Sequence, residues 1–291
     1  MSSKVLLVTG TTSGMGRTIA LDAAAAGYTV VATGRDEQRM TELAEDAKAR
    51  GVELDIRFLE ITDHPAVYAL IDDVARTHGH LDAVVSQAGG IFALGTAEQI
   101  TMDGFRFVLE TNFFGNLAVI KAALPHLRAS KGRLIVTTSA NGLVGAPYND
   151  AYAASKFALE GAVESLAPVV ARYGVRTTIV EPGPVATDVM APRRFEKLLP
   201  TDVVENNPYP EPWDFLSRVI GNTGGVQAVE EVGPQILDLL GRENPPLRFQ
   251  TAQWARDFVA PKLSADLDGR KVYEASEAYI GLAGLTEPVA G

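Results

Sequence analysis

The feature that most constrains the fold is a glycine-rich turn near the N-terminus, placed between an apolar run and an alanine-rich segment. Residues 5–8 are all apolar, which is typical of a strand buried on both faces. Residues 9–16 form the turn, and residues 17–26 are predicted to form a helix that ends at Gly27. This order of strand, glycine turn and helix favours a nucleotide-binding unit, with an ordinary turn before a helix as the alternative.

The glycines of the turn have separate physical roles. Gly10 allows a tight turn, while Gly14 and Gly16 let the backbone approach a pyrophosphate and let the helix approach the sheet. The start of the helix offers free N–H groups and a positive dipole end to phosphate oxygens. The residues of this turn expected to contact a dinucleotide are Gly10, Thr12, Ser13, Gly14, Met15 and Gly16.

The end of the second predicted strand, residues 29–33, indicates which dinucleotide is bound. A protein that selects NAD(H) places an acidic side chain at this strand tip to bind the ribose 2′-hydroxyl. Here the tip is Gly34 followed by Arg35, and a guanidinium suits a 2′-phosphate. We therefore expect NADP(H) to be favoured over NAD(H), the alternative being that Arg35 is a solvated surface charge. Asp36 could reach the ribose, but we expect it to be the N-cap of a helix over 37–50.

Strand and helix patterns alternate along the following part of the chain. Further strands are predicted at 53–59, 81–86, 133–139 and 175–180, and further helices at 63–78, 105–129 and 151–173. This alternation predicts an α/β fold with a doubly wound (Rossmann) parallel sheet, completed to seven strands by an edge strand at 246–250. We expect one domain over 1–291, with a cofactor-binding and catalytic core at 4–187 and a substrate-pocket and lid segment at 188–291. In that segment, helices are expected at 188–199, 213–221, 226–241, 254–263 and 272–282, and a loop at 200–212.

Two residues of the predicted helix 151–173 carry the expected chemistry. Tyr152 and Lys156 are four residues apart, so on a helix they share a face. Because a nearby ammonium favours the phenolate, Lys156 is expected to lower the pKa of Tyr152. Ser139 ends a predicted strand and Asn112 lies inside the helix predicted before it, and both can converge on this pair. Asn112 is either a satisfied core amide or a residue that opens its helix and holds a water.

Taken in order and at these spacings, the motifs resemble the short-chain dehydrogenase/reductase family. The resemblance covers residues 4 to about 190. It rests on the glycine turn and on Ala88-Gly89, Asn112, Ser139, the Tyr152/Lys156 pair, and Pro182-Gly183 with Thr187. The tail and Arg35 are most similar to the hydroxysteroid-dehydrogenase-like and oxoacyl-reductase-like branches. The resemblance implies an enzyme that moves hydride between NADP(H) and a carbonyl or alcohol substrate.

The resemblance also implies a role for each residue at the reaction centre. Tyr152 would be the general acid in reduction and the base in oxidation, and Lys156 would lower its pKa and bind the nicotinamide ribose. Ser139 would orient the substrate oxygen, and Asn112 would hold a water that links Lys156 to solvent. Two hydroxyl donors at the substrate oxygen would stabilise the negative charge that builds there during hydride transfer.

Cofactor contacts beyond the glycine turn are implied in the same way. Pro182, Gly183 and Thr187 would contact the nicotinamide end. The rest of the expected set is Glu60, Ile61, Gln87, Ala88, Gly89, Val185 and the Tyr152/Lys156 pair. Two positions depart from the family pattern: Gln87 replaces the usual Asn and Glu60 the usual Asp. Each keeps its hydrogen-bonding group on a side chain one methylene longer, so we expect changed cofactor affinity rather than lost activity.

Composition limits the other functions. The net charge of −10 argues against nucleic acid or an anionic membrane as the main partner. The chain has no Cys, no N-terminal signal pattern and no apolar run of about 18 residues, so we expect a cytoplasmic protein without a membrane span. His64, His78, His80 and His126 lack metal-ligand spacing, so no metal is expected. The helices 105–129 and 151–173 carry small and apolar residues suited to a homodimer or homotetramer interface.

The substrate is predicted only as a class. An apolar pocket lining favours a hydrophobic ketone or secondary alcohol, and its candidates are Phe92, Leu94, Leu143, Val144, Tyr148, Val189, Met190, Phe195 and Trp213. The alternative function is a non-catalytic nucleotide-binding sensor or scaffold, against which the intact Tyr152/Lys156 pair counts. An epimerase or dehydratase would carry a different glycine spacing and a domain for sugar nucleotides.

Overall fold

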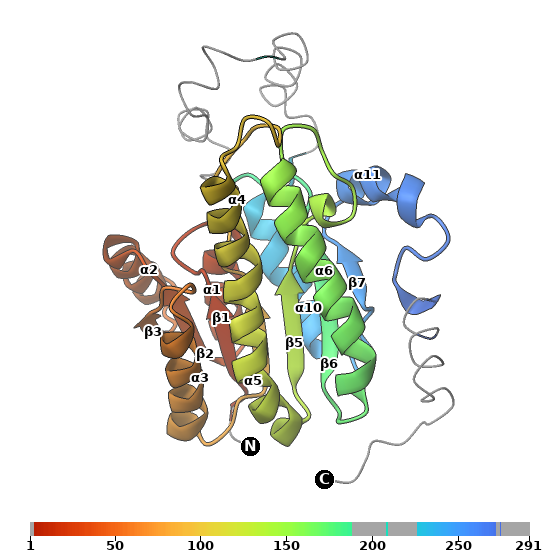
Figure 1. The fold of residues 1–291 in the computed structure, drawn as a ribbon. Coiled ribbons are helices and arrows are strands. Elements are labelled where there is room, and N and C mark those ends of the chain that lie inside the picture. The colour runs from red at the N-terminus through yellow and green to blue at the C-terminus, as the bar shows by residue number, and fades with distance from the viewer. Residues whose placement is uncertain (1–2, 188–207, 209–225, 272–273, 275–291) are drawn as a thin grey trace.

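Seven parallel strands form the centre of the molecule, and helices cover both faces of the sheet (Figure 1). The computed structural model describes residues 3–187, 208, 226–271 and 274. The strands are Val5–Thr9 (β1), Thr29–Gly34 (β2), Asp55–Phe58 (β3), Ala83–Ser86 (β4), Arg133–Thr137 (β5), Arg176–Glu181 (β6) and Arg248–Gln250 (β7). Their order in the sheet is β3-β2-β1-β4-β5-β6-β7, which confirms the predicted doubly wound fold.

The strand order reverses between β1 and β4, where ligands bind in open parallel sheets. Strand β1 pairs with β2 on one side and with β4 on the other, so that Leu7 lies opposite both Val31 and Val84. Every residue of β1 and β4 is buried, in agreement with the apolar runs in the sequence. The carboxyl ends of these central strands therefore meet at one edge of the sheet.

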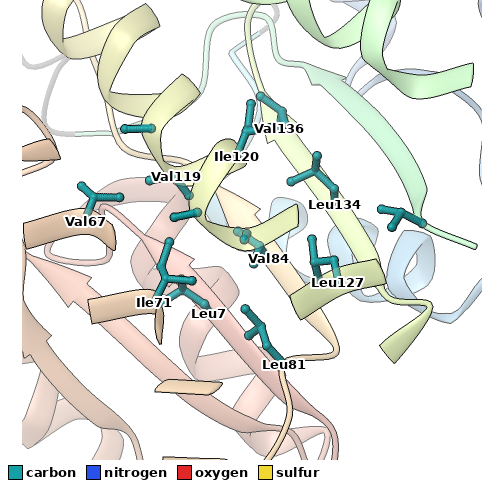
Figure 2. Packing of buried hydrophobic residues seen from close by; sticks show 14 of the residues in the cluster. Leu7, Val67, Ile71, Leu81, Val84, Val119, Ile120, Leu127, Leu134 and Val136 are labelled. Carbon is teal, nitrogen blue, oxygen red and sulfur yellow. The ribbon is translucent and has the colours of Figure 1, made fainter. Parts of the chain in front are cut away.

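The two faces of the sheet have separate apolar cores, because successive side chains of a strand point to opposite sides. One core lies under helices α3 (His64–His78), α5 (Asn116–Ser130) and α6 (Asp150–Ala171), where Ile71 lies beside Leu7 and Ile120 beside Val136 (Figure 2). The other lies under α1 (Gly14–Ala25), α2 (Glu37–Ala49) and α10 (Val232–Gly241). Both faces of the central strands are thus covered by helices, whereas the edge strand β3 remains partly exposed.

The N-termini of the first three helices can be compared with the predicted ones. Helix α1 begins at Gly14, three residues before the predicted start, so two glycines of the turn are among its first three residues. The N-caps predicted at Asp36 and Asp63 are confirmed, since their side chains accept hydrogen bonds from the backbone N–H groups of Arg39 and Ala66. Asp36 is therefore the N-cap of helix α2.

The long helix predicted at 105–129 is interrupted in the structure. Helix α4 (Met102–Leu109) leads into a π-helical stretch, Glu110–Gly115, and then into α5. The wider π turn contains Asn112, so the expectation that this residue opens its helix is met in the backbone. Among the described helices, only Met102–Ser130 has the length and hydropathy to cross a bilayer, and 56% of its most apolar window is buried inside the protein, as in a core helix.

The described C-terminal part matches the predictions incompletely. The helix predicted over 226–241 is shorter, consisting of a 3-10 turn (Val229–Glu231) followed by α10. Strand β7 and helix α11 (Gln253–Leu263) lie where an edge strand and a helix are predicted. The elements predicted at 188–199, 200–212, 213–221 and 272–282 lie outside the described residues, apart from single positions.

Candidate active site

A cavity of about 370 Å³ lies over the carboxyl ends of β1, β2 and β4. Most residues predicted to contact a dinucleotide line it: Gly10, Thr12, Ser13, Gly14, Met15, Gly16, Arg35, Glu60, Ile61, Gln87, Ala88, Gly89 and Thr187. Tyr152, Lys156, Pro182, Gly183 and Val185 are not among its lining residues. The lining also includes Phe92, Gly34 and Asp36, which the sequence analysis named in other roles, and Thr9, Thr33, Arg39, Leu59 and Thr111, which it missed.

The glycine turn is held tightly against the loop after β4. Gly10 has a φ of +72°, and a Cβ there would lie 2.8 Å from the Cα of Ala88. A Cβ on Gly16 would lie 2.2 Å from the carbonyl oxygen of Gly10. The hydroxyl of Thr9 accepts hydrogen bonds from the N–H groups of Gln87 and Ala88, each at 3.0 Å. Only glycine therefore fits at these two positions of the turn without moving the backbone around it.

Two polar atoms in the cavity wall fit a polar ligand. The Oε1 of Gln87 and the hydroxyl of Thr111 are buried and have no hydrogen-bond partner within the described part of the chain. Buried polar atoms are normally hydrogen-bonded, so both suit a ligand that brings donors and acceptors of its own. The N–H groups of the glycine turn fit the pyrophosphate of a nicotinamide dinucleotide, and the Oε1 of Gln87 suits one of its hydroxyl or amide donors.

At the outer end of the cavity, Arg35 and Glu60 form an ion pair. An Nη of Arg35 lies 2.9 Å from an Oε of Glu60, and the two side chains are 50% and 32% exposed. Burial alone would raise the pKa of Glu60, but hydrogen bonds from Arg35 and from the backbone of Thr62 lower it. The guanidinium predicted to meet a 2′-phosphate is thus at the expected place, paired with a carboxylate. Arg17 and Arg39 line an adjacent hollow of about 400 Å³.

The predicted reaction centre is assembled from one helix and the strand end facing it. The hydroxyl of Ser139 lies near enough to the phenol of Tyr152 to lower its pKa. The Nζ of Lys156 lies 5.8 Å from the centre of the Tyr152 ring and donates to the carbonyl of Thr137 at 3.2 Å. Helix α6 supplies the Tyr and Lys on one face, as the spacing of four residues predicts.

Asn112 joins this centre as a satisfied amide in an opened helix. Its Nδ2 donates to the carbonyl of Gly90 at 3.0 Å and to the hydroxyl of Ser155 at 3.1 Å, and its Oδ1 accepts from the N–H of Gly90 at 3.0 Å. A Cβ on Gly89 would lie 2.7 Å from that Oδ1 and 3.7 Å from the Nζ of Lys156. The amide therefore ties the glycine loop after β4 to the helix that carries Lys156.

Asn116 is a site residue that the sequence analysis missed. It is fully buried, accepts from the hydroxyl of Ser86 at 2.6 Å, and donates to the carbonyls of Ala88 at 2.9 Å and Asn112 at 3.0 Å. By donating a hydrogen bond to the carbonyl of Asn112, the side chain of Asn116 satisfies an acceptor within the π turn. A second Asn four residues after Asn112 in an apolar helix was the available signal.

Burial governs the pKa values at the reaction centre. Desolvation raises the pKa of Tyr152 above its ordinary value, and the hydrogen bond from Ser139 opposes that rise. Desolvation also lowers the pKa of Lys156 to about 8, and the negative charge of Glu160 opposes that fall. The Tyr152 pKa is thus raised rather than lowered, with burial as the largest cause, and an effect of Lys156 on it stays a prediction.

The predicted substrate-pocket residues divide into three groups. Phe92 lines the cavity, whereas Leu94, Leu143 and Tyr148 are buried in packing contacts. Leu143 and its neighbour Val144 pack against helix α11 rather than facing open space. Helix α11 also brings Trp254 beside the loop after β6, where a Cβ on Gly183 would lie 2.7 Å from the indole. Val189, Met190, Phe195 and Trp213 lie outside the described residues.

Comparison with known proteins identifies the relatives of this chain. A family model described as short chain dehydrogenase matches residues 4–197. The chain is 34% identical over 266 residues to 17-beta-hydroxysteroid dehydrogenase type 1 of Homo sapiens, covering 87% of this chain and 79% of that protein. It is 33% identical over 276 residues to retinol dehydrogenase 8 of Bos taurus, covering 89% of this chain and 85% of that protein.

Solved structures give the same result. A short-chain dehydrogenase from Streptomyces avermitilis superposes with a TM-score of 0.77 and 28% identity, covering 96% of this chain and 98% of that chain. A variant actinorhodin polyketide ketoreductase, crystallised with NADPH, superposes with a TM-score of 0.72 and 26% identity, covering 86% of this chain and 96% of that chain. The family match and the relatives each span most of the sequence, and the chain belongs to the short-chain dehydrogenase/reductase family.

Proposed function

We propose that this protein is an NADP(H)-dependent oxidoreductase that transfers hydride between the cofactor and a hydrophobic ketone or secondary alcohol. The observation that carries the proposal is that four side chains lie close together beside the cavity lined by the glycine turn: Ser139, Tyr152, Lys156 and Asn112. Relatives named for a hydroxysteroid and for retinol support an apolar alcohol or ketone as the substrate class.

The side chains of the reaction centre suit proton transfer coupled to hydride transfer. A bound nicotinamide dinucleotide would supply the hydride in reduction and accept it in oxidation. In reduction, Tyr152 gives its hydroxyl proton to the substrate oxygen as the carbonyl carbon gains hydride, and Ser139 donates a second hydrogen bond to that oxygen. Because burial raises the pKa of Tyr152, its hydroxyl is protonated at neutral pH, as a general acid requires.

Lys156 and Asn112 support this proton transfer. With a pKa of about 8, Lys156 is mainly a cation at neutral pH, and its ammonium lies on the same helix face as Tyr152. The charge of Lys156 would stabilise the phenolate left after proton transfer. Asn112 holds the glycine loop after β4 in place against this ammonium, through its hydrogen bonds with Gly90.

The preference for NADP(H) rests on Arg35. Its guanidinium lies at the end of β2, beside the part of the cavity where the family's adenosine ribose would sit. A cation at this position favours a 2′-phosphate over a free hydroxyl. The NADPH in the related ketoreductase structure agrees with this assignment.

The test of the reaction is a screen of ketones and alcohols that follows NADPH absorbance. We expect turnover by the parent protein and a loss of about a thousandfold in kcat for Tyr152→Phe, because that variant lacks the transferable proton. Its binding of NADPH, measured by fluorescence titration, should match the parent. Retained turnover in Tyr152→Phe would mean that another group handles the proton. Cofactor binding without turnover on any substrate would favour a sensor.

We also propose that the protein forms a homodimer or homotetramer through α4, α5 and α6. The region carries exposed aromatic side chains, with Phe107 49%, Phe114 43% and Phe157 38% exposed. Large exposed apolar groups gathered on neighbouring elements are typical of an interface between subunits. Light scattering should give at least twice the monomer mass of 31.0 kDa. A monomeric mass would contradict this assembly.

A further inference from the structure

One face of helix α6 continues past the reaction centre into a buried cluster of charges. Tyr152, Lys156, Glu160 and Glu164 follow one another at intervals of four residues, so they lie in a row along the helix. The first two bind Ser139 and the carbonyl of Thr137. Glu160 accepts a hydrogen bond from the hydroxyl of Thr138. Three successive residues, Thr137 at the end of β5 and then Thr138 and Ser139, thus each face one member of the row.

The cluster is centred on Arg248 of β7. Its guanidinium forms ion pairs with Glu160 and Glu164 of α6 and, at 2.7 Å, with Glu181 of β6. The side chains of Arg248 and Glu160 are 5% exposed, and that of Glu181 is fully buried. Removing each charge from water costs several kcal/mol, which the ion pairs must offset. The proposed proton transfer does not involve these residues directly.

The position of Glu160 connects the cluster with the reaction centre. Its carboxylate is held on two sides, by the hydroxyl of Thr138 and by Arg248, and it lies one helical turn from Lys156. The ionisable groups around it are Lys156 and Glu164 from its own helix, Glu181 from β6 and Arg248 from β7. Lys156 is itself buried and has Glu160 as the nearby negative charge that acts on it.

We propose that Glu160 is a positioning residue whose fixed carboxylate keeps Lys156 protonated beside Tyr152. This inference rests on the proposed function only for its effect on turnover. Thr138 and Arg248 hold the carboxylate of Glu160 in one orientation, one helical turn from Lys156. The opposing effects of burial and of Glu160 on the Lys156 pKa agree with this role.

The charge of Glu160 can be removed without removing its shape. Glu160→Gln keeps a partner for Thr138, and Arg248 retains Glu181 and Glu164, so the variant should fold. A charge of opposite sign one turn away in a buried site shifts a pKa by roughly one unit or more. We therefore expect the pKa of Lys156 in Glu160→Gln to fall by about one unit or more below the parent value of about 8.

Glu164→Gln is the matched control. It makes the same chemical change and loses the same cation partner, but it lies one turn farther from Lys156 and is 31% exposed. Solvent screening and distance should leave the Lys156 pKa within about 0.3 unit of the parent. Glu160→Asp is the second variant, since it keeps the charge on a shorter side chain and should titrate closer to the parent than Glu160→Gln does.

Two measurements report the pKa of Lys156. The first is an NMR titration of lysine labelled with carbon-13 at Cε, in which the Lys156 signal is assigned with Lys156→Met. The second is the pH profile of kcat/KM for ketone reduction, whose alkaline limb should move to lower pH in Glu160→Gln. Loss of packing alone would lower the whole profile and leave the limb in place.

The outcomes separate this inference from the proposed function. A parent protein without turnover on any ketone would contradict the proposed reaction, and the NMR titration would still decide the role of Glu160. An unchanged Lys156 pKa in Glu160→Gln, or an equal shift in Glu164→Gln, would overturn the inference while leaving the reaction intact.

Discussion

Two groups of ion pairs, the cluster around Arg248 and the Arg35–Glu60 pair at the cavity rim, differ in how deeply they are buried. We expect them to differ in function for that reason. The Arg248 cluster has side-chain exposures of 5% for Arg248 and Glu160. The Arg35–Glu60 pair at the cavity rim has exposures of 50% and 32%. In the buried cluster, burial raises the pKa of Glu181 to about 7 although Arg248 opposes that rise, whereas at the rim the pKa of Glu60 is lowered by its hydrogen bonds although burial opposes that fall.

The difference shows how one fold uses the same residue types for two purposes. A buried cluster costs too much to break, so it fixes the geometry of the strands and helix that meet in it. A rim pair contributes about 0–1 kcal/mol, so a ligand phosphate can take the arginine from its carboxylate. We therefore expect substitutions in the buried cluster to act on stability and in the rim pair to act on cofactor choice.

The largest effect is expected for Arg248→Met. This change leaves Glu160 and Glu181 buried without their cation, and loss of one partner of a buried ion pair typically costs about 3–5 kcal/mol. Chemical denaturation should show a loss of that size in the free energy of unfolding. Arg106→Ala, which removes a 70% exposed arginine paired with Asp103, serves as control and should stay within about 1 kcal/mol of the parent.

The cost of Arg248→Met should depend on pH. Burial raises the pKa of Glu181 from 4.5 to about 7. The contribution of Glu181 to the free energy of unfolding is therefore complete below about pH 4.5 and is lost as the pH rises through about 7. Arg248 opposes this rise, and without it the carboxylates hold their protons to higher pH. The deficit relative to the parent should therefore be larger at about pH 8 than at about pH 5. Equal deficits at both pH values would mean that Arg248 acts through packing.

Features that depend on residues close together in the sequence could be predicted, whereas contacts between distant residues could not. Local patterns predicted the alternating strands and helices, the caps at Asp36 and Asp63, and the shared face of Tyr152 and Lys156, because each depends on residues within one turn. The ion pair of Arg248 with Glu160 joins positions 88 residues apart, so no local spacing signals it.

Two further features depended on contacts that a linear pattern does not contain. The π turn around Asn112 is satisfied by Asn116, whose partners include the ends of β4 and the following loop. The pKa of Tyr152 depends on how deeply α6 is buried, and the spacing to Lys156 does not report this depth.

A smaller effect is expected at the rim, for Arg35→Ala. If Arg35 binds the 2′-phosphate, kcat/KM with NADPH should fall by about tenfold and kcat/KM with NADH should change little, because only NADPH carries that group. Stability should change by less than about 1 kcal/mol, in contrast to Arg248→Met. A parent protein that uses NADH as well as NADPH, or an Arg35→Ala variant that loses both cofactors equally, would contradict the assignment.

The smallest effect, and the one that defines the rim pair, is expected for Glu60→Gln. Its carboxylate holds the guanidinium of Arg35 at 2.9 Å and stays ionised at neutral pH, because hydrogen bonds from Arg35 and Thr62 lower its pKa. Gln can still accept from the N–H of Thr62, so the loop should keep its shape. Releasing Arg35 and removing a negative charge near the phosphate should lower the KM for NADPH by roughly threefold and leave that for NADH unchanged. A higher KM for NADPH would instead mean that Glu60 holds Arg35 in its phosphate-binding position, and the rim pair would then be preorganised in the same sense as the buried cluster.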